Sequence, residues 1–410
     1  MSSRAYIAGV GMTPFGKHAE RSLKSLGAEA IQGAIADAGI SSGEINAAYM
    51  GNAAAGVMTG QVCVPGQVIL RDIGIGGIPV INVENACATA ATAFQQAVAM
   101  VESGGADVVL ACGVEKLFSD DKLKTFSVFT GAVDVERMDD VSELINQRMQ
   151  AAGVEPTEGA GTSRSLFIDI YVTWALAHMQ RYGTTREQIA AVPAKNSLHG
   201  SLNPLAQYRG QITVQEVLAA REVAWPLTLP MCSPIGDGAA AALVVSPRKA
   251  RELGMSRMVE VKASLLSSGW DYAEGEQETL AARSAREAYE KAGLGPQDLD
   301  CIELHDASAP SEIMYYEYLG LCDYGEGGPL VESGATTLGG SIPVNTSGGL
   351  LRKGHPIGAT GLAQIHELVL QLRGEAGHRQ VEGARVALAE NGGGFIGSDA
   401  AAMAMTILAI

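Results

Sequence analysis

A cysteine at position 87 lies where an apolar stretch gives way to small residues, in the order Ala86-Cys87-Ala88-Thr89-Ala90. The pattern predicts a strand over 79–83 and a helix over 89–102, which would place the thiol at the N-terminal end of a helix. The helix dipole and free N–H groups favour a thiolate there, so we expect the pKa of Cys87 to be lowered. Small neighbours would let a thioester approach such a nucleophile. A buried structural cysteine in an Ala-rich helix is the alternative.

A histidine near the C-terminus lies between glycines, in the order Gly354-His355-Pro356-Ile357-Gly358. The glycines indicate close backbone packing, and Pro356 restricts the turn after the histidine. An imidazole held in this way could take the proton of a thiol and later donate to a thioester oxygen. A histidine in a surface loop near the start of a helix is the alternative.

Two further strand ends carry polar or glycine residues. One apolar run ends in His305-Asp306, and another ends in Glu390-Asn391-Gly392-Gly393-Gly394. Ligands of α/β sheets bind at strand ends, and N–H groups exposed among the glycines could stabilise an oxyanion. The His-Asp pair alone is a weak signal, because adjacent strand side chains point to opposite faces. The glycine run could equally be a tight turn.

The elements that must position these residues alternate between strands and helices. In the first third we expect strands over 5–10, 47–50, 79–83 and 106–112, and helices over 23–38, 61–73 and 89–102. Between 118 and 230 the chain is more polar and helical (141–151, 167–182 and 185–197), like an insertion. Afterwards we expect strands over 239–245, 258–264, 300–304, 342–345, 384–389 and 400–407, and helices over 280–292, 310–319 and 361–371. This rhythm predicts an α/β sheet covered by helices on both faces.

The two ends of the chain share a weak internal duplication. Each runs strand, turn, helix, strand, with Cys87 in the first turn and His355 in the second. Two related halves are therefore plausible, and Cys87 and His355 would occupy corresponding ends of corresponding strands.

The composition narrows the function classes. The 410 residues are 47% hydrophobic, enough for a large core, and carry a net charge of −16 that disfavours nucleic-acid binding. Six scattered cysteines without close pairs indicate neither a metal site nor a disulfide framework. No apolar run approaches the ~18 residues of a membrane span, and the N-terminus does not read as a signal segment. We expect a soluble, cytoplasmic protein without nucleic-acid or membrane partners.

Taken together and in this order, these motifs resemble the thiolase superfamily over essentially the whole chain. The resemblance includes the segments Cys232-Ser233-Pro234-Ile235-Gly236-Asp237-Gly238 and Gly354-His355-Pro356-Ile357-Gly358-Ala359-Thr360-Gly361. The segments 83–90 and 361–364 are most similar to the sterol-carrier-protein type of thiolase, which is acetyl-CoA acetyltransferase-like. The resemblance implies two related βαβαβ halves in a five-layer αβαβα core. The halves would be 1–117 with 231–250 and 251–410, and the insertion 118–230 would be a loop domain that holds coenzyme A.

The resemblance also implies an activity: an acyltransferase that cleaves a 3-oxoacyl-CoA with free CoA. Cys87 would accept the acyl group, His355 would activate it, and His305 would help bind the thioester oxygen of the second substrate. The N–H groups of Cys87 and Gly392 would form the oxyanion hole, and Ser233 would contact the pantetheine arm. Coenzyme A would be substrate and product, with no permanently bound cofactor and no metal. Because coenzyme A is polyanionic, its site must be a local exception to the acidic charge.

One departure from the family pattern bears on the mechanism. Thiolases carry a second catalytic cysteine, either in a His-Asp-Cys-Phe motif or before the Gly-rich strand end. This chain has Ala307 at the first position and Glu390 at the second. A buried Glu390 with a raised pKa could transfer the proton instead. His305, Ser308, water, or a substrate whose leaving carbanion is already stabilised, such as one with an aryl or carboxyl substituent, are the other possibilities.

Two other functions remain open on the same scaffold. One is a carbon–carbon bond-forming acyltransferase or a retro-aldolase, although retro-aldolases of this branch tend to replace the cysteine and histidines by tyrosines. The other is a non-catalytic lipid-carrier subunit. The resemblance further implies a homodimer that pairs through its N-terminal halves and a small zinc-ribbon/OB-fold partner protein.

Overall fold

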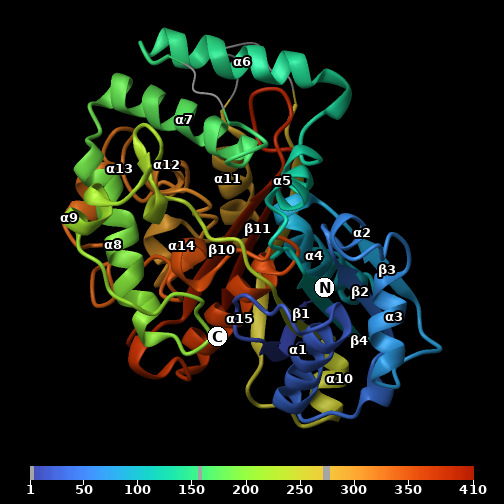
Figure 1. The fold of residues 1–410 in the computed structure, drawn as a ribbon. Helices are drawn as coiled ribbons and strands as arrows, with labels where there is room; N and C mark the ends of the chain where they lie inside the picture. Colours follow the sequence, from blue (N-terminus) through green and yellow to red (C-terminus); the bar gives the residue numbers. More distant parts are fainter. Residues whose placement is uncertain (1–3, 156–158, 271–277) are drawn as a thin grey trace.

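A nine-stranded mixed sheet runs through the molecule (Figure 1), and a computed structural model describes it over residues 4–155, 159–270 and 278–410. The predicted halves and loop domain also include 1–3, 156–158 and 271–277, which lie outside the described residues. The strand order is β3-β2-β4-β7-β1-β8-β11-β10-β9. These strands are β1 (Ala5–Met12), β2 (Ala47–Gly51), β3 (Val80–Val83), β4 (Val108–Glu115), β7 (Gly238–Val245), β8 (Val259–Ser268), β9 (Cys301–Glu303), β10 (Val386–Gly393) and β11 (Ala402–Ala409).

The central strands are apolar because both of their faces are covered. All eight residues of β4 and all eight of β7 are buried. In β4, Val109 and Ala111 face an inner core, whereas Val108 and Leu110 face an outer one. The continuous apolar runs in the sequence are therefore explained by strands that are buried on both faces of the sheet.

Two helices form the middle layer between the halves of the sheet. Helices α4 (Thr89–Glu102) and α15 (Thr360–Arg373) contact each other and strands of both halves. Their starts approach very closely, because a Cβ on Gly361 would lie only 2.6 Å from the backbone nitrogen of Ala91. A larger residue at Gly361 would therefore push the two helices apart.

Further helices cover the outer faces. Helices α1 (Leu23–Ala38), α3 (Pro65–Asp72) and the short α10 (Pro247–Glu252) lie on the N-terminal half, and α11 (Leu280–Ala292) and α12 (Ala309–Tyr318) on the C-terminal half (Figure 1). The order of layers is αβαβα. The predicted α/β fold class is confirmed, with one refinement: β1 and β8 pair antiparallel and join the halves into one sheet.

The strand order repeats on either side of that junction. Outward from it, β1, β7, β4, β2 and β3 correspond to β8, β11, β10, β9 and the bridge between Ile302 and Val344. Cys87 follows β3 and His355 follows Val344, so they occupy corresponding positions. The predicted strand 342–345 is wrong beyond that bridge. Pro343 has no N–H for a ladder, and Asn345 turns to a φ of 56°.

The segment between β4 and β7 is mainly helical. It contains α5 (Lys122–Thr130), α6 (Met138–Ala151), α7 (Leu166–Tyr182), α8 (Arg186–Leu202), α9 (Val214–Ala219) and the hairpin of β5 (Glu222–Ala224) and β6 (Leu227–Thr228). Its apolar side chains share a core with the C-terminal half, where α12, α13 (Gly327–Glu332) and α14 (Gly349–Lys353) lie (Figure 1). Across the described ranges, no helix is long and apolar enough to cross a membrane.

Replacing Gly361 with Ala tests the closeness of the middle layer. Because the new methyl group would meet the backbone of Ala91 and the side chain of Asn391, we expect overpacking to cost about 1–3 kcal/mol. A lower midpoint of urea unfolding would report this loss. The control is Gly76→Ala, because the Cβ position of Gly76 has nothing within 4 Å. Equal midpoints for the two variants would contradict the tight contact.

Candidate active site

Cys87 lies on a strained turn between β3 and α4. A 3₁₀ turn over Ala86–Ala88 carries it, and Ala86 adopts a left-handed φ of 48° that disfavours residues with a Cβ. Thr89 Oγ1 accepts a hydrogen bond from the N–H of Asn85 (2.8 Å) and donates one to the carbonyl of Ala86 (2.7 Å). The threonine thus holds the turn that presents the thiol.

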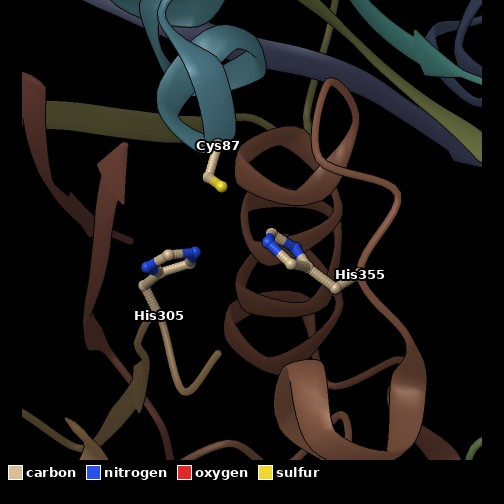
Figure 2. Close-up of side chains that lie close together, drawn as sticks. All are labelled: Cys87, His305 and His355. Carbon is tan, nitrogen blue, oxygen red and sulfur yellow. The ribbon is translucent and has the colours of Figure 1, made fainter. Parts of the chain in front are cut away.

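The structure brings Cys87, His305 and His355 together. The sulfur and one ring nitrogen of each histidine all lie within 4.8 Å of one another, and all three residues are buried. The imidazole rings are 5.1 Å apart, centroid to centroid, at 65°. Figure 2 shows the Cys87 side chain pointing from the start of α4 towards the space between the two rings.

Thr360 fixes the orientation of the His355 ring. The Thr360 hydroxyl donates to the carbonyl of Pro356 (3.1 Å), so its oxygen accepts the other hydrogen bond, from Nδ1–H of His355 (2.8 Å). The proton of neutral His355 is therefore on Nδ1, and Nε2 keeps its lone pair. This is the tautomer that a base needs when it takes a proton through Nε2.

Burial keeps this cluster uncharged in the resting protein. Desolvation raises the pKa of Cys87 to about 12, and the charges of Glu115 and Glu84 act in the same direction. Desolvation also lowers the pKa of His305 to about 4 and that of His355 well below its usual range. The expected lowering of the Cys87 pKa is wrong, because burial outweighs the favourable N–H groups of Gly394 and Cys87 itself. The thiol must lose its proton as it attacks.

Two buried carboxylates fix the loops that carry the histidines. Asp306 accepts hydrogen bonds from the N–H of Leu350 (2.7 Å) in α14 and from Asn196 Nδ2 (2.9 Å). Its side chain is thus committed to α14, the helix that leads to His355, while the neighbouring His305 ring faces Cys87. Glu115, at the end of β4, accepts from the N–H of Gly358 (3.0 Å) in the His355 loop.

Glu390 lies directly behind His305. It is fully buried, and its Oε2 accepts a hydrogen bond from the N–H of His305 (2.8 Å). Oε1 makes no well-formed hydrogen bond, although the Tyr315 hydroxyl and the N–H of Gly392 approach the carboxyl and favour its charged form. Desolvation is the largest effect and raises the pKa of Glu390 to about 8. The carboxyl is therefore mostly protonated at neutral pH.

A cavity of about 680 Å³ leads to Cys87 and His355. Ser233 lines it, and its backbone N–H donates to the carbonyl of Ala307 (3.0 Å). Six cationic residues line the same cavity, and no acidic residue of the described chain does. They are Lys17, Lys122, Arg164, Arg209, Arg221 and Arg352. In a chain of net charge −16, this cavity is locally cationic, which suits an anionic ligand.

Comparison with known proteins identifies the family. Residues 5–217 match the thiolase N-terminal domain, and residues 272–406 match the thiolase C-terminal domain-like family. The chain belongs to the thiolase family. It is 39% identical to human sterol carrier protein 2 over 95% of this chain and 69% of that protein. It is 38% identical to acetyl-CoA acetyltransferase of Methanothermobacter thermautotrophicus (96% and 97%) and 36% identical to benzoylsuccinyl-CoA thiolase subunit BbsB of Thauera aromatica (96% and 96%).

Two solved structures share the fold of this chain. The Ltp2–ChsH2(DUF35) aldolase superposes with a TM-score of 0.74 at 24% identity, covering 98% of this chain and 97% of that one. Human mitochondrial 3-ketoacyl-CoA thiolase in complex with CoA superposes with a TM-score of 0.69 at 16% identity, covering 100% and 98%.

Two glycines of the run at the end of β10 have N–H groups that act on different side chains. The N–H of Gly392 approaches Glu390, whereas the N–H of Gly394 acts on the Cys87 sulfur. Between them, Gly393 packs against the Cys87 turn, since a Cβ there would lie 2.5 Å from the nitrogen of Ala88. The pairing of Cys87 with Gly392 in an oxyanion hole stays a prediction. No motif in the sequence indicates that the N–H of Gly394 acts on the sulfur.

The cations of the cavity were not indicated by the sequence pattern. The ammonium groups of Lys17 and Lys122 lie 5.0 and 5.1 Å from the centre of the Phe118 ring. Lys122 is four residues from Phe118 in the sequence, whereas Lys17 is far from both and is brought to the ring only by the fold. Local spacing could therefore not reveal this group of cations.

A thiol and two imidazoles are also donors that suit zinc. No other group of three such donors occurs among the residues that the structure describes. A metal bound there would occupy the sulfur and both ring nitrogens. Nucleophilic attack requires these same atoms, so the geometry fits acyl transfer better than a resident metal.

The pH dependence of alkylation tests the uncharged resting state. With a pKa of about 12 for Cys87, the thiolate fraction grows with pH throughout the neutral range. We expect the rate of Cys87 labelling by iodoacetamide to rise about tenfold per unit between about pH 7 and 9. Peptide mass spectrometry would follow the site, with Cys87→Ala as the blank. A rate independent of pH near neutrality would indicate a thiolate–imidazolium pair instead.

Proposed function

We propose that this thiolase transfers the acyl group of a CoA thioester to Cys87 and, in the degradative direction, cleaves a 3-oxoacyl-CoA with free CoA. The observation that carries the proposal is the buried thiol facing two neutral imidazoles at a cavity lined by six cations. The alternatives, an aldol-type enzyme and a lipid carrier, have no use for such a thiol. The family and its acyl-CoA relatives support the same class of reaction.

In the first half of the reaction, His355 Nε2 takes the proton of Cys87 while the sulfur attacks the 3-oxo carbon. The N–H groups of Cys87 and Gly392 stabilise the oxyanion that forms. The bond between C2 and C3 then breaks, leaving the acyl group on Cys87 and an enolate on the departing thioester. His305, whose Nε2 is buried without a partner in the free protein, donates its N–H to that enolate oxygen.

We assign the proton that completes this step to Glu390. Its carboxyl contacts the backbone of His305, and Tyr171 of the cavity wall senses the charges of both Cys87 and Glu390. Protonated Glu390 gives its proton to C2 and becomes a carboxylate. In the second half, that carboxylate takes the thiol proton of CoA, the CoA sulfur attacks the acyl group, and Cys87 leaves with the proton held by His355. Every proton is then back in place.

We propose that residues 118–230 form the loop domain for coenzyme A, between halves 1–117 with 231–250 and 251–410. The segment supplies Lys122, Arg209 and Arg221 to the cavity. Ser233, which comes shortly after the segment in the sequence, also lines the cavity. The exposed ammonium groups of Lys17 and Lys122 suit the phosphates of CoA. Coenzyme A is then substrate and product, without a permanently bound cofactor.

The assembly of this thiolase is also a proposal. A homodimer through the N-terminal halves follows from the family resemblance. The Ltp2–ChsH2(DUF35) assembly supports a small zinc-ribbon/OB-fold partner, which should be included in assays. A cytoplasmic location fits the expected solubility.

Intact mass spectrometry tests the nucleophile. We expect a panel of acyl-CoAs to yield a covalent acyl adduct on the wild type and none on Cys87→Ala, because the thioester forms on that sulfur. His355→Asn should slow adduct formation by about 10²–10⁴-fold, the usual range for a lost general base. Absence of an adduct from every thioester, with and without a partner protein, would refute the enzyme proposal.

Glu390→Gln tests the carboxyl separately from the nucleophile. A thiolate leaves readily without an acid, whereas a carbanion does not. We therefore expect cleavage of a 3-oxoacyl-CoA to fall about 10²–10⁴-fold, with a much smaller loss in adduct formation from a simple acyl-CoA. Single-turnover mass spectrometry measures both steps. Equal effects on both steps, or none on either, would remove Glu390 from the carbon–carbon step.

A further inference from the structure

A second cavity of about 500 Å³ lies on the outer side of the C-terminal half, between α6, α7, α11, α12 and β11. Within the described chain it shares no lining residue with the cavity that leads to Cys87. Hydroxyl and amide groups of Thr173, Gln180 and Ser311 line it beside aromatic rings. Such a polar and roomy space can hold water.

Tyr315 connects this second cavity with Glu390. Its side chain lines the cavity, and its hydroxyl approaches the Glu390 carboxyl. The same hydroxyl would lie 3.3 Å from a Cβ on Gly392, and Glu390 Oε1 would lie 3.6 Å from that point. Tyr315 therefore lines the second cavity and has its hydroxyl in the neighbourhood of the Glu390 carboxyl.

Among the residues that the structure describes, no other side-chain hydrogen bond of Glu390 leads to solvent. Glu390 is fully buried, and its well-formed side-chain hydrogen bond comes from the backbone N–H of His305, an amide too weakly acidic to relay a proton. Oε1 is left without a well-formed partner.

We propose that Glu390 exchanges its proton with water in the second cavity through the Tyr315 hydroxyl, while the substrate cavity is occupied. This inference rests on the proposed role of Glu390 in the carbon–carbon step. When Glu390 is ionised, a water molecule gives a proton to the phenol oxygen as the phenol gives its own to the carboxylate. Tyr315 is unchanged, and the hydroxide left in the cavity is neutralised by bulk solvent. The same proton transfers in reverse order remove the proton from Glu390.

The surroundings of Tyr315 favour such a concerted transfer. Burial raises its pKa well above the usual range, and the charges of Glu390 and Asp399 act in the same direction. A phenolate is therefore disfavoured, and the hydroxyl must receive one proton as it gives up the other. Tyr318 offers an internal comparison, because it lines the same cavity and its ring centroid lies 6.0 Å from that of Tyr315. No hydrogen bond links Tyr318 to Glu390 among the described residues.

Exchange of the α-hydrogens of acetyl-CoA in D₂O tests the route. Without Tyr315, a proton taken from C2 would stay on Glu390 and return to the same carbon. We expect Tyr315→Phe to lower α-hydrogen exchange at least about tenfold relative to Cys87 acylation in the same sample, within the range of a lost proton-transfer group. Tyr318→Phe should keep the wild-type ratio. Nuclear magnetic resonance follows the exchange, and intact mass spectrometry follows the adduct.

The possible results separate the two proposals. A selective loss in Tyr315→Phe supports the route. An unchanged ratio in Tyr315→Phe, or an equal loss in Tyr318→Phe, overturns it, since packing of the cavity would then be the cause. A wild type that forms the Cys87 adduct but exchanges no α-hydrogen also overturns it. A wild type that forms no adduct overturns the proposed function, and the route with it.

Discussion

The close approach of α4 and α15 is the constraint on which the site depends. Each helix begins just after a reactive loop, with Cys87 before α4 and His355 before α15. Gly361 lets the helix starts touch. Gly113 of β4 lets the His355 loop pack closely on that strand, since a Cβ there would lie 2.3 Å from the carbonyl oxygen of Gly358. Two distant parts of the chain thereby place a sulfur and an imidazole within reach of each other.

The buried carboxyl groups of the site have two different roles. The carboxyl oxygens of Glu115 and Asp306 accept hydrogen bonds from backbone N–H groups, and both side chains thereby anchor the loops. Glu390 has only one such bond and keeps an oxygen free. Burial also raises the pKa of Glu115, to about 7, so the raised pKa alone does not distinguish anchor from catalyst. What distinguishes the anchors from the proposed catalyst is the number of carboxyl oxygens that accept hydrogen bonds.

The sequence predicted local features well and assembled features poorly. The bounds of α1, α4 and α11 agree with the expectations, because periodic apolar residues define them and α1 ends at Gly39 with a left-handed φ of 67°. Cys87, His305 and His355 were recognisable because each carries its own motif. The pKa of Cys87, the cations around Phe118 and the neighbours of Glu390 all depend on which distant residues surround a group. No spacing along the chain contains that information, so these features required the structure.

The burial of Cys87 has a consequence outside the reaction. Peroxide attacks a cysteine through its thiolate, and sulfenic acid is the first product. With its pKa raised to about 12 and its side chain buried, Cys87 presents almost no thiolate to oxidants at neutral pH. The low thiolate fraction and the burial thus protect the nucleophile from such oxidation between turnovers. At neutral pH it reacts efficiently when a thioester is in place and His355 can take the proton.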